Sequence, residues 1–168
     1  MDRTSACGAD GWEFEPPRAH FMIQCTFENE NKASLRHVVV DVLVLRRKQI
    51  LLVKRVGKLL EGGKWGLIGG FLERDENCEQ GVAREVSEET GYDVSNIKLL
   101  KINDSPNRPN EDRQNVAFVY VCQAGDKKGD GDWESEEQRW FDLDKLPNKK
   151  EVAFDHFENI QYYLKRKK

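Results

Sequence analysis

Three glutamates lie within five consecutive residues of the segment REVSEETGYD, residues 84–93. A helix turns by about 100° per residue, so a helix through this segment places Glu85, Glu88 and Glu89 on one face. Glu85 and Glu89 repel each other at this spacing, and acidic groups near the end of a helix oppose its dipole. A solvated acidic face is the ordinary explanation. A divalent cation would remove both penalties, and carboxylate oxygens suit Mg²⁺ or Mn²⁺.

The residues around this helix follow a longer pattern. From Gly70 the chain reads GFLERDENCEQGVAREVSEETGY, in which five residues separate Gly70 from Glu76 and seven separate Glu76 from Arg84 and Glu85. A pair of glutamates and Gly91 complete the pattern. It resembles the signature of the Nudix hydrolase family, G-x5-E-x7-R-E-U-x-E-E-x-G-U, in which U is a bulky aliphatic residue. We refer to this segment as the box.

The resemblance covers about residues 37–165, including QRWFDLDKLP and VAFDHFENI, and does not reach residues 1–34. Two departures concern packing more than chemistry: Tyr92 takes the last aliphatic position, and LIGG stands where many relatives have a proline. We therefore expect an N-terminal extension, residues 1–34, followed by a Nudix hydrolase domain, residues 35–168. The implied fold class is α/β, an α/β/α sandwich with a central mixed sheet and a catalytic loop-helix-loop.

The resemblance implies hydrolysis of the pyrophosphate bond in a nucleoside diphosphate linked to another group. It implies that the carboxylates of Glu85, Glu88 and Glu89 and the carbonyl of Gly69 bind the metal. The expected cofactor is Mg²⁺, with Mn²⁺ as the alternative, because a diphosphate needs its charge neutralised and its attacking water acidified. Without a Cβ at Gly69 and Gly70, the main chain can come close to the metal and the phosphates.

Other residues of the box have a structural role by the same resemblance. Glu76 and Arg84 form an ion pair that braces the loop against the helix. Gly70 lies in that loop, and Gly91 ends the helix as the residue best suited to a left-handed cap.

The base that activates water is either a box glutamate or a carboxylate from a loop before the last strand. That loop offers Glu134, Glu136 and Glu137 in the segment WESEEQRW, where a solvated acidic loop is the ordinary explanation. We favour the loop, because Glu85 and Glu89 are poor proton acceptors while they bind cations. Within the loop we favour Glu136, and then Glu134.

The segment NDSPNRPNEDRQNVAFVYV resembles a loop and strand of Nudix ADP-ribose pyrophosphatases, although it lacks their DPR triplet. Arg108 and Arg113 are then candidates for phosphate contact, since a guanidinium binds phosphate oxygens in a bidentate manner. Arg55 is a further candidate for substrate contact. The array that marks NADH-preferring relatives is absent downstream of the box. Aromatic side chains that could stack an adenine, although core packing is their ordinary role, are Phe71, Trp65 and Phe118.

Three functions fit these residues. The first is a Mg²⁺-dependent pyrophosphatase that releases AMP and a phosphosugar from ADP-ribose or a similar nucleotide sugar. The second is an enzyme that clears nucleoside triphosphates or oxidised nucleotides. The third is a nucleotide sensor with a Nudix fold and no turnover, which the complete set of box glutamates disfavours.

Strands and two helices must position these groups. HVVVDVLVL is β-branched and apolar and predicts a strand buried on both faces over residues 37–45. The box predicts a helix over residues 78–90, whose apolar arc consists of Val82, Ala83, Val86 and Thr90. Residues 127–137 read as an acidic loop. The second helix, over residues 154–167, carries a core-packing stripe of Phe154, Phe157, Ile160 and Leu164. Further strands are predicted at residues 50–53, 97–102, 115–124 and 138–143.

Charge and cysteine content limit the classes of partner. The net charge of -3 and the pI of about 5.7 argue against a general attraction to nucleic acid or anionic membrane. We find no apolar run of transmembrane length and no signal-peptide core, so we expect a cytoplasmic enzyme acting on a small nucleotide. Residues 1–34 fit an arm, an edge strand or a homodimer contact. The scattered cysteines predict reduced thiols, and a zinc site from Cys7, His20, Cys25 and His37 lacks the usual close ligand pairs.

Overall fold

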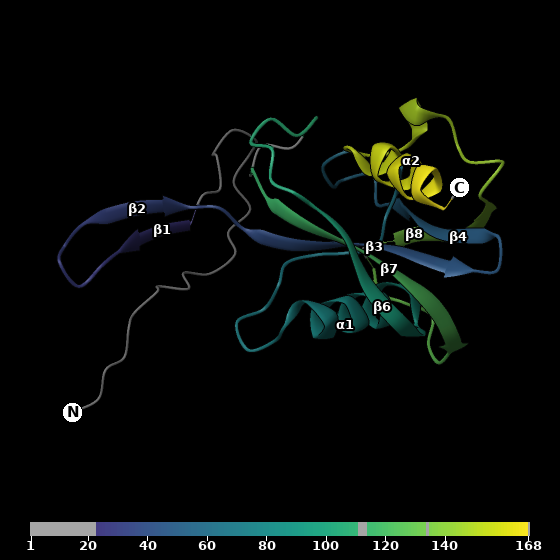
Figure 1. Ribbon diagram of the computed structural model, residues 1–168, viewed down its shortest axis with the longest axis horizontal. Helices are drawn as coiled ribbons and strands as arrows, with labels where there is room; N and C mark the ends of the chain where they lie inside the picture. The colour runs from purple at the N-terminus through teal and green to yellow at the C-terminus, as the bar shows by residue number, and fades with distance from the viewer. Residues whose placement is uncertain (1–22, 111–113, 134, 168) are drawn as a thin grey trace.

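The computed structural model describes residues 23–110, 114–133 and 135–167 of the 168-residue chain (Figure 1). Its elements are β1 (Ile23–Thr26), β2 (Lys32–Leu35), β3 (Val38–Arg46), β4 (Gln49–Arg55), β5 (Trp65–Gly66), α1 (Cys78–Thr90), β6 (Tyr92–Asn103), β7 (Val116–Lys127), β8 (Ser135–Asp142), the 3-10 helix η1 (Lys149–Glu151) and α2 (His156–Arg166).

The main sheet is mixed, as predicted. β3 runs parallel to β7 from Val38 opposite Val116, and antiparallel to β4 from Val44 opposite Leu51. β6 lies at the edge beside β7, and β4 also pairs with β5 and β8. α1 covers one face of this sheet and α2 covers the other, which gives the expected α/β/α sandwich (Figure 1).

β3 forms the centre of the core because its apolar side chains alternate between the two faces. Val40, Val42 and Val44 pack in one cluster with Val82 and Val86 of α1. Leu43 and Leu45 pack on the opposite face with Ile160 of α2. The predicted double burial of this strand is confirmed.

α1 begins and ends at the predicted residues. Asn77 caps its N-terminus in a capping box with Gln80, and Gly91 follows its last residue in the left-handed conformation, with φ 74°. The expected apolar arc is confirmed for three of its four positions. Ala83 is exposed, whereas the glutamate Glu89 is buried.

Three other expectations need correction. β6 begins at Tyr92, directly after the helix cap, and is therefore longer than the predicted strand. β8 begins at Ser135, so Glu136 and Glu137 lie in a strand and not in a loop. Ser135 pairs with Arg55 and Glu137 with Lys54 of β4, and Glu136 lies at the register shift between these two pairs. Phe154 precedes α2, so the stripe on that helix consists of Phe157, Ile160 and Leu164, which pack in the core as predicted.

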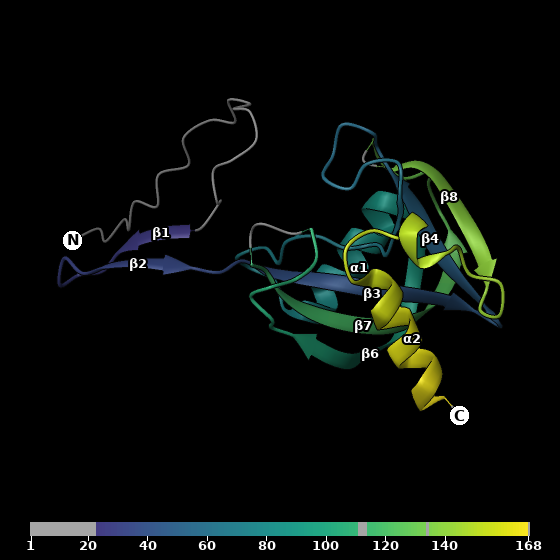
Figure 2. The ribbon, with the colours of Figure 1, turned by 90° about the horizontal axis from the view of Figure 1, so that it is seen from above.

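β1 and β2 form a hairpin that projects away from the sandwich in both views (Figures 1 and 2). Its apolar residues Ile23, Phe27 and Leu35 are exposed. Cys25 lies in this hairpin, whereas Cys7 and His20 of the disfavoured zinc site lie outside the described residues. The domain boundary at residue 34 and a homodimer contact stay predictions.

The helices of the described residues are too short or too polar to cross a membrane.

The C-terminus of α1 packs directly on the loop that follows β7. The Gly91 carbonyl accepts hydrogen bonds from the backbone N–H groups of Lys128, at 2.7 Å, and Gly129, at 3.3 Å. A Cβ at Gly91 would lie 2.0 Å from the Gly129 carbonyl oxygen. Gly91 therefore ends the helix and also allows the close approach of a second backbone.

We predict that Gly91→Ala destabilises the protein by at least about 1–2 kcal/mol, because it combines a left-handed residue with a backbone clash. Gly129→Ala is the matched control, since a Cβ there would meet its nearest atom, the Cα of Gly91, at 3.8 Å. Urea unfolding of both variants measures the difference. Equal stability of the two variants would contradict this account of Gly91.

Candidate functional site

The segment that carries the two glycines lies antiparallel to β3. The Gly70 carbonyl accepts a hydrogen bond from the Val40 N–H at 2.9 Å, and the Ile68 carbonyl accepts one from the Val42 N–H at 2.8 Å. A Cβ at Gly69 would lie 1.9 Å from the Val40 carbonyl oxygen. No other residue type fits at Gly69 without moving this backbone.

Two carboxylates of α1 face this glycine pair. Glu89 is buried, and its Oε1 accepts a hydrogen bond from the Gly69 N–H at 2.9 Å. The Glu85 carboxylate fills the space beside Gly70, where a Cβ would lie 2.4 Å from Glu85 Oε1. The Glu88 side chain is 54% exposed and lies at the edge of the group. The structure thus brings together the box residues that the sequence assigned to the metal.

Arg84 holds the surrounding loop and helix together. Its Nη2 and Nε bind the two Glu76 carboxylate oxygens at 2.7 and 3.0 Å, and Nη2 also donates to the Phe71 carbonyl at 3.0 Å. Its Nη1 reaches Glu85 Oε1 at 2.9 Å and Glu88 Oε2 at 3.0 Å. The hydrogen bond from Arg84 lowers the pKa of Glu76, against the effect of burial, and the same bond raises the pKa of Arg84. Both groups are therefore charged, and the predicted pair is present.

Two donors within the protein, which were not predicted from the sequence, relieve the repulsion between the glutamates without a metal. Arg84 bonds two of the three glutamates, and the Gly69 N–H bonds the third. The signal for Arg84 was visible, because it lies next to Glu85 and at i,i+4 from Glu88. The hydrogen bond from the Gly69 N–H to Glu89 had no visible signal in the sequence, since it depends on how the loop folds against β3.

The donor set at the glycine pair fits a hard divalent cation. It consists of carboxylate oxygens packed against the backbone of Gly69 and Gly70, which have no side chains of their own, and this matches the all-oxygen preference of Mg²⁺. A second group of potential ligand atoms lies within 4.8 Å of one another on Asp41, Asp155 and His156. Arg108 bonds both of those carboxylates and compensates one of their two negative charges.

Arg108, a predicted candidate for phosphate contact, has two carboxylate partners inside the protein. It is buried, and its Nη2 bonds Asp155 Oδ1 at 2.8 Å and Asp41 Oδ2 at 3.1 Å. Burial raises the pKa of Asp155, but the hydrogen bond and the charge of Arg108 lower it by more. The net pKa is below the ordinary value, so the carboxyl is ionised. The guanidinium of Arg108, which we expected to contact a phosphate, is paired with two carboxylates inside the protein.

The other predicted substrate contacts lie in different environments. Phe71 is 40% exposed, with its ring 5.0 Å from that of His37. The Arg55 guanidinium lies 5.1 Å from the Phe154 ring, and its Nε donates to a backbone carbonyl. Trp65 and Phe118 pack in the core, as their ordinary role predicts. Arg113 and Glu134 lie outside the described residues.

The start of β8 is fastened to the end of α1. Gln138 Nε2 donates to the Glu89 carbonyl at 3.1 Å and to the Asp130 carbonyl at 2.8 Å. Glu136 follows Ser135, the first residue of β8, and its Oε1 accepts a hydrogen bond from the Gly57 N–H at 3.0 Å. The chain segment that carries the candidate bases is thus attached to the helix that carries the candidate ligands.

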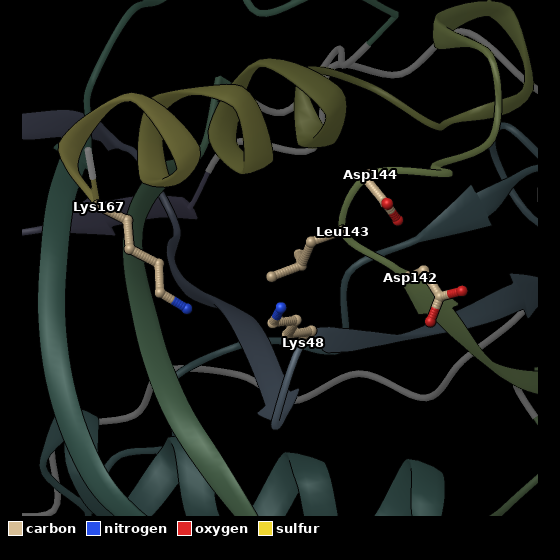
Figure 3. A pocket seen from close by; sticks show the side chains of 5 residues that line it. All are labelled: Lys48, Asp142, Leu143, Asp144 and Lys167. Atoms are coloured by element: carbon tan, nitrogen blue, oxygen red, sulfur yellow. The ribbon is translucent and has the colours of Figure 1, made fainter.

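A separate hollow lies beyond the far end of β3, between the turn at Lys48 and the end of α2 (Figure 3). It is lined by Lys48, Asp142, Leu143, Asp144 and Lys167. Its charges are mixed, and none of the predicted site residues lines it, so we assign no substrate to it.

Comparison with known proteins agrees with this geometry. The NUDIX domain model matches residues 35–163. An ADP-ribose pyrophosphatase of Methanocaldococcus jannaschii is 35% identical over 131 residues, which are 77% of this chain and 74% of that protein. The NAD-capped RNA hydrolase NudC of Vibrio atlanticus is 41% identical over 86 residues, 51% of this chain but 30% of its own length. The chain spans about half the length, or less, of several such relatives.

Solved structures show the same likeness. A MutT NUDIX hydrolase from Burkholderia pseudomallei superposes with a TM-score of 0.64 at 29% identity, covering 75% of this chain and 96% of that one. A bifunctional NMN adenylyltransferase/ADP-ribose pyrophosphatase from Francisella tularensis has a TM-score of 0.62 at 25% identity, covering 78% and 42% of the two chains.

We predict that Gly70→Ala weakens Mn²⁺ binding, because the new methyl group displaces the Glu85 carboxylate without removing any charge. The melting temperature should change little, since the clash is with the mobile end of a side chain. Titration calorimetry with Mn²⁺ measures the affinity, and Gly129→Ala is the control, because a Cβ there would lie 3.8 Å from its nearest neighbour. Unchanged Mn²⁺ affinity in Gly70→Ala would remove Glu85 from the ligand set.

Proposed function

The chain belongs to the NUDIX family of pyrophosphohydrolases, and we propose that it hydrolyses the pyrophosphate bond of ADP-ribose or a similar nucleotide sugar with Mg²⁺. The observation that carries this proposal is the convergence of Glu85 and Glu89 on the Gly69–Gly70 backbone. The relative from Methanocaldococcus jannaschii supports the choice of substrate, because the similarity extends over most of both chains.

In this proposal Glu85, Glu89 and the Gly69 carbonyl bind the cation, and Glu88 assists from the edge. A metal held there would supply positive charge against the diphosphate and would lower the pKa of the attacking water. Arg84 orients Glu85 and Glu88 through one guanidinium nitrogen while its other nitrogens hold Glu76. The ligands are therefore positioned before the substrate arrives, which lowers the reorganisation that the reaction requires.

The proposed general base is Glu136, with Glu134 as the alternative. Two contacts support a base in this part of the chain. Gln138 attaches the segment to the Glu89 carbonyl, and a Cβ at Gly131 would lie 2.2 Å from that same oxygen. Glu136 therefore lies on a strand that is in close contact with the helix that carries Glu85 and Glu89.

A second candidate substrate is a dinucleotide that contains the ADP-ribose unit, such as NAD or the NAD cap of an RNA. The identity of 41% to NudC over 86 residues favours it, although the chain spans 30% of that protein. Both candidates present the same diphosphate to the metal, and they differ in the groups attached to the two riboses of the ADP-ribose unit.

We predict that the protein with Mg²⁺ converts ADP-ribose to AMP and ribose 5-phosphate faster than it hydrolyses NAD, NADH, dinucleoside polyphosphates or nucleoside triphosphates. Glu85→Gln should fold and lose turnover by orders of magnitude, because an amide is a poor ligand for Mg²⁺. Chromatography of the products gives kcat/KM for each substrate. Release of pyrophosphate from a triphosphate as the fastest reaction would contradict the proposal.

We also predict that Glu136→Gln lowers kcat by about 10²- to 10⁴-fold while KM and Mn²⁺ affinity stay nearly constant, as for loss of a general base. Glu134→Gln is measured in parallel as the alternative. Glu137→Gln is the control, because Glu137 is the neighbouring residue on the strand and its carboxylate pairs with Arg139. If all three variants, Glu137→Gln included, kept wild-type kcat, the base would be a glutamate of the box.

A further inference from the structure

A cluster of ionisable side chains is buried beside the glycine segment, where the start of α2 meets β3. We call Asp41, Arg108, Asp155 and His156 the buried ionic cluster, and each is at most 8% exposed. Asp41 lies in β3, Arg108 in the loop after β6, and the other two at the start of α2. Three separate parts of the chain therefore meet at this point.

Arg108 joins two of these parts. Its Nη2 lies between Asp41 and Asp155, which are 67 and 47 residues away in the sequence, and Asn103 also donates a hydrogen bond to Asp155. A buried ion pair is weak evidence for stability, because apolar residues of similar volume often do as well. The cluster thus invites an explanation other than stability.

His156 connects the cluster to the segment that carries Gly69. Its Nδ1 accepts a hydrogen bond from the Leu67 N–H at 2.9 Å. Burial lowers the pKa of His156, against the opposing charges of Asp41 and Asp155, so the imidazole is neutral. A neutral imidazole that accepts at Nδ1 carries its proton on Nε2, which lies 3.7 Å from Asp41 Oδ1. Asp41 therefore favours the tautomer that can accept from Leu67.

Leu67 is two residues before Gly69, and it is buried. Its N–H has no access to water, so loss of the acceptor would cost about 1–3 kcal/mol or force the segment to move. The next residue, Ile68, bonds Val42 of β3. His156 and β3 thus hold the backbone leading to Gly69 at consecutive residues.

We propose that His156 and Asp41 are positioning residues that fix the Leu67–Gly69 backbone, so that the Gly69 carbonyl and the Glu89 carboxylate face the same cation. Arg108 holds Asp41 and Asp155 at the separation that this arrangement needs. The inference rests on the proposed function for its ligands and adds residues outside the box, on β3 and at the start of α2.

The experiment compares His156→Leu, which removes the acceptor, with His156→Asn, whose Oδ1 can replace Nδ1. Mn²⁺ affinity should fall by about 10- to 100-fold in His156→Leu, as for other residues that orient metal ligands, and His156→Asn should restore most of it. Hydrogen exchange of the Leu67 amide should accelerate in His156→Leu and stay slow in His156→Asn. The KM of ADP-ribose should change less than kcat.

Asn159→Leu is the matched control. Asn159 lies on the same helix, is fully buried, and its side-chain amide makes no hydrogen bond within the described residues. Its replacement should leave Mn²⁺ affinity at the wild-type value. Should His156→Leu fail to fold, Asp41→Asn gives a milder test, with an intermediate loss of Mn²⁺ affinity expected.

Two outcomes would overturn the inference: equal Mn²⁺ affinity in His156→Leu and the wild type, or equal losses in His156→Leu and His156→Asn. Failure of the proposed function is a separate result. If the wild-type protein binds Mn²⁺ but does not hydrolyse ADP-ribose, the substrate is wrong, while Mn²⁺ affinity and amide exchange still test His156.

Discussion

The contact between the Gly69 backbone and β3 is the constraint on which the site depends. The Val40 and Val42 N–H groups bond the carbonyls on either side of Gly69, and the space between the two backbones excludes a Cβ. β3 is buried along almost its whole length, so the glycine segment that is bonded to it is held against a rigid strand. α1 then needs to pack only on the same face of β3 to bring its glutamates against the glycines.

Clustered carboxylates on α1 require compensation that does not depend on a metal. Arg84 supplies part of it through Glu85 and Glu88, and the Gly69 N–H supplies part through Glu89. These hydrogen bonds explain how a helix with an acidic C-terminal half can be stable in the protein without a bound cation. It also means that a cation would enter a site whose ligands already have hydrogen-bonded positions, so little ordering of side chains remains to be done on binding.

Features set by residues close together in the sequence could be predicted, whereas features set by distant residues could not. The first and last residues of α1 were predicted correctly, because the box and the cap residue Gly91 are signals within the helix segment itself. Arg108 was misjudged because its partners are 47 and 67 residues away, and a loop sequence rich in proline and asparagine gives no sign of burial. Glu136 and Glu137 read as loop residues because their strand arises from pairing with β4, whereas their own β-propensity is low. His156 escaped notice because its signal, a histidine after an aspartate at a helix start, is common in proteins without any metal.

The distance in sequence between Leu67 and His156, 89 residues, has a consequence for synthesis on the ribosome. Domains emerge from their N-terminal end, so every glutamate of the box leaves the exit tunnel long before the start of α2. β7, the parallel partner of β3, also comes after the box. A nascent chain that already carries the complete motif has β3 beside its glycine segment but still lacks β7 and His156, so the hydrogen bond from the Leu67 N–H forms only after the start of α2 has emerged.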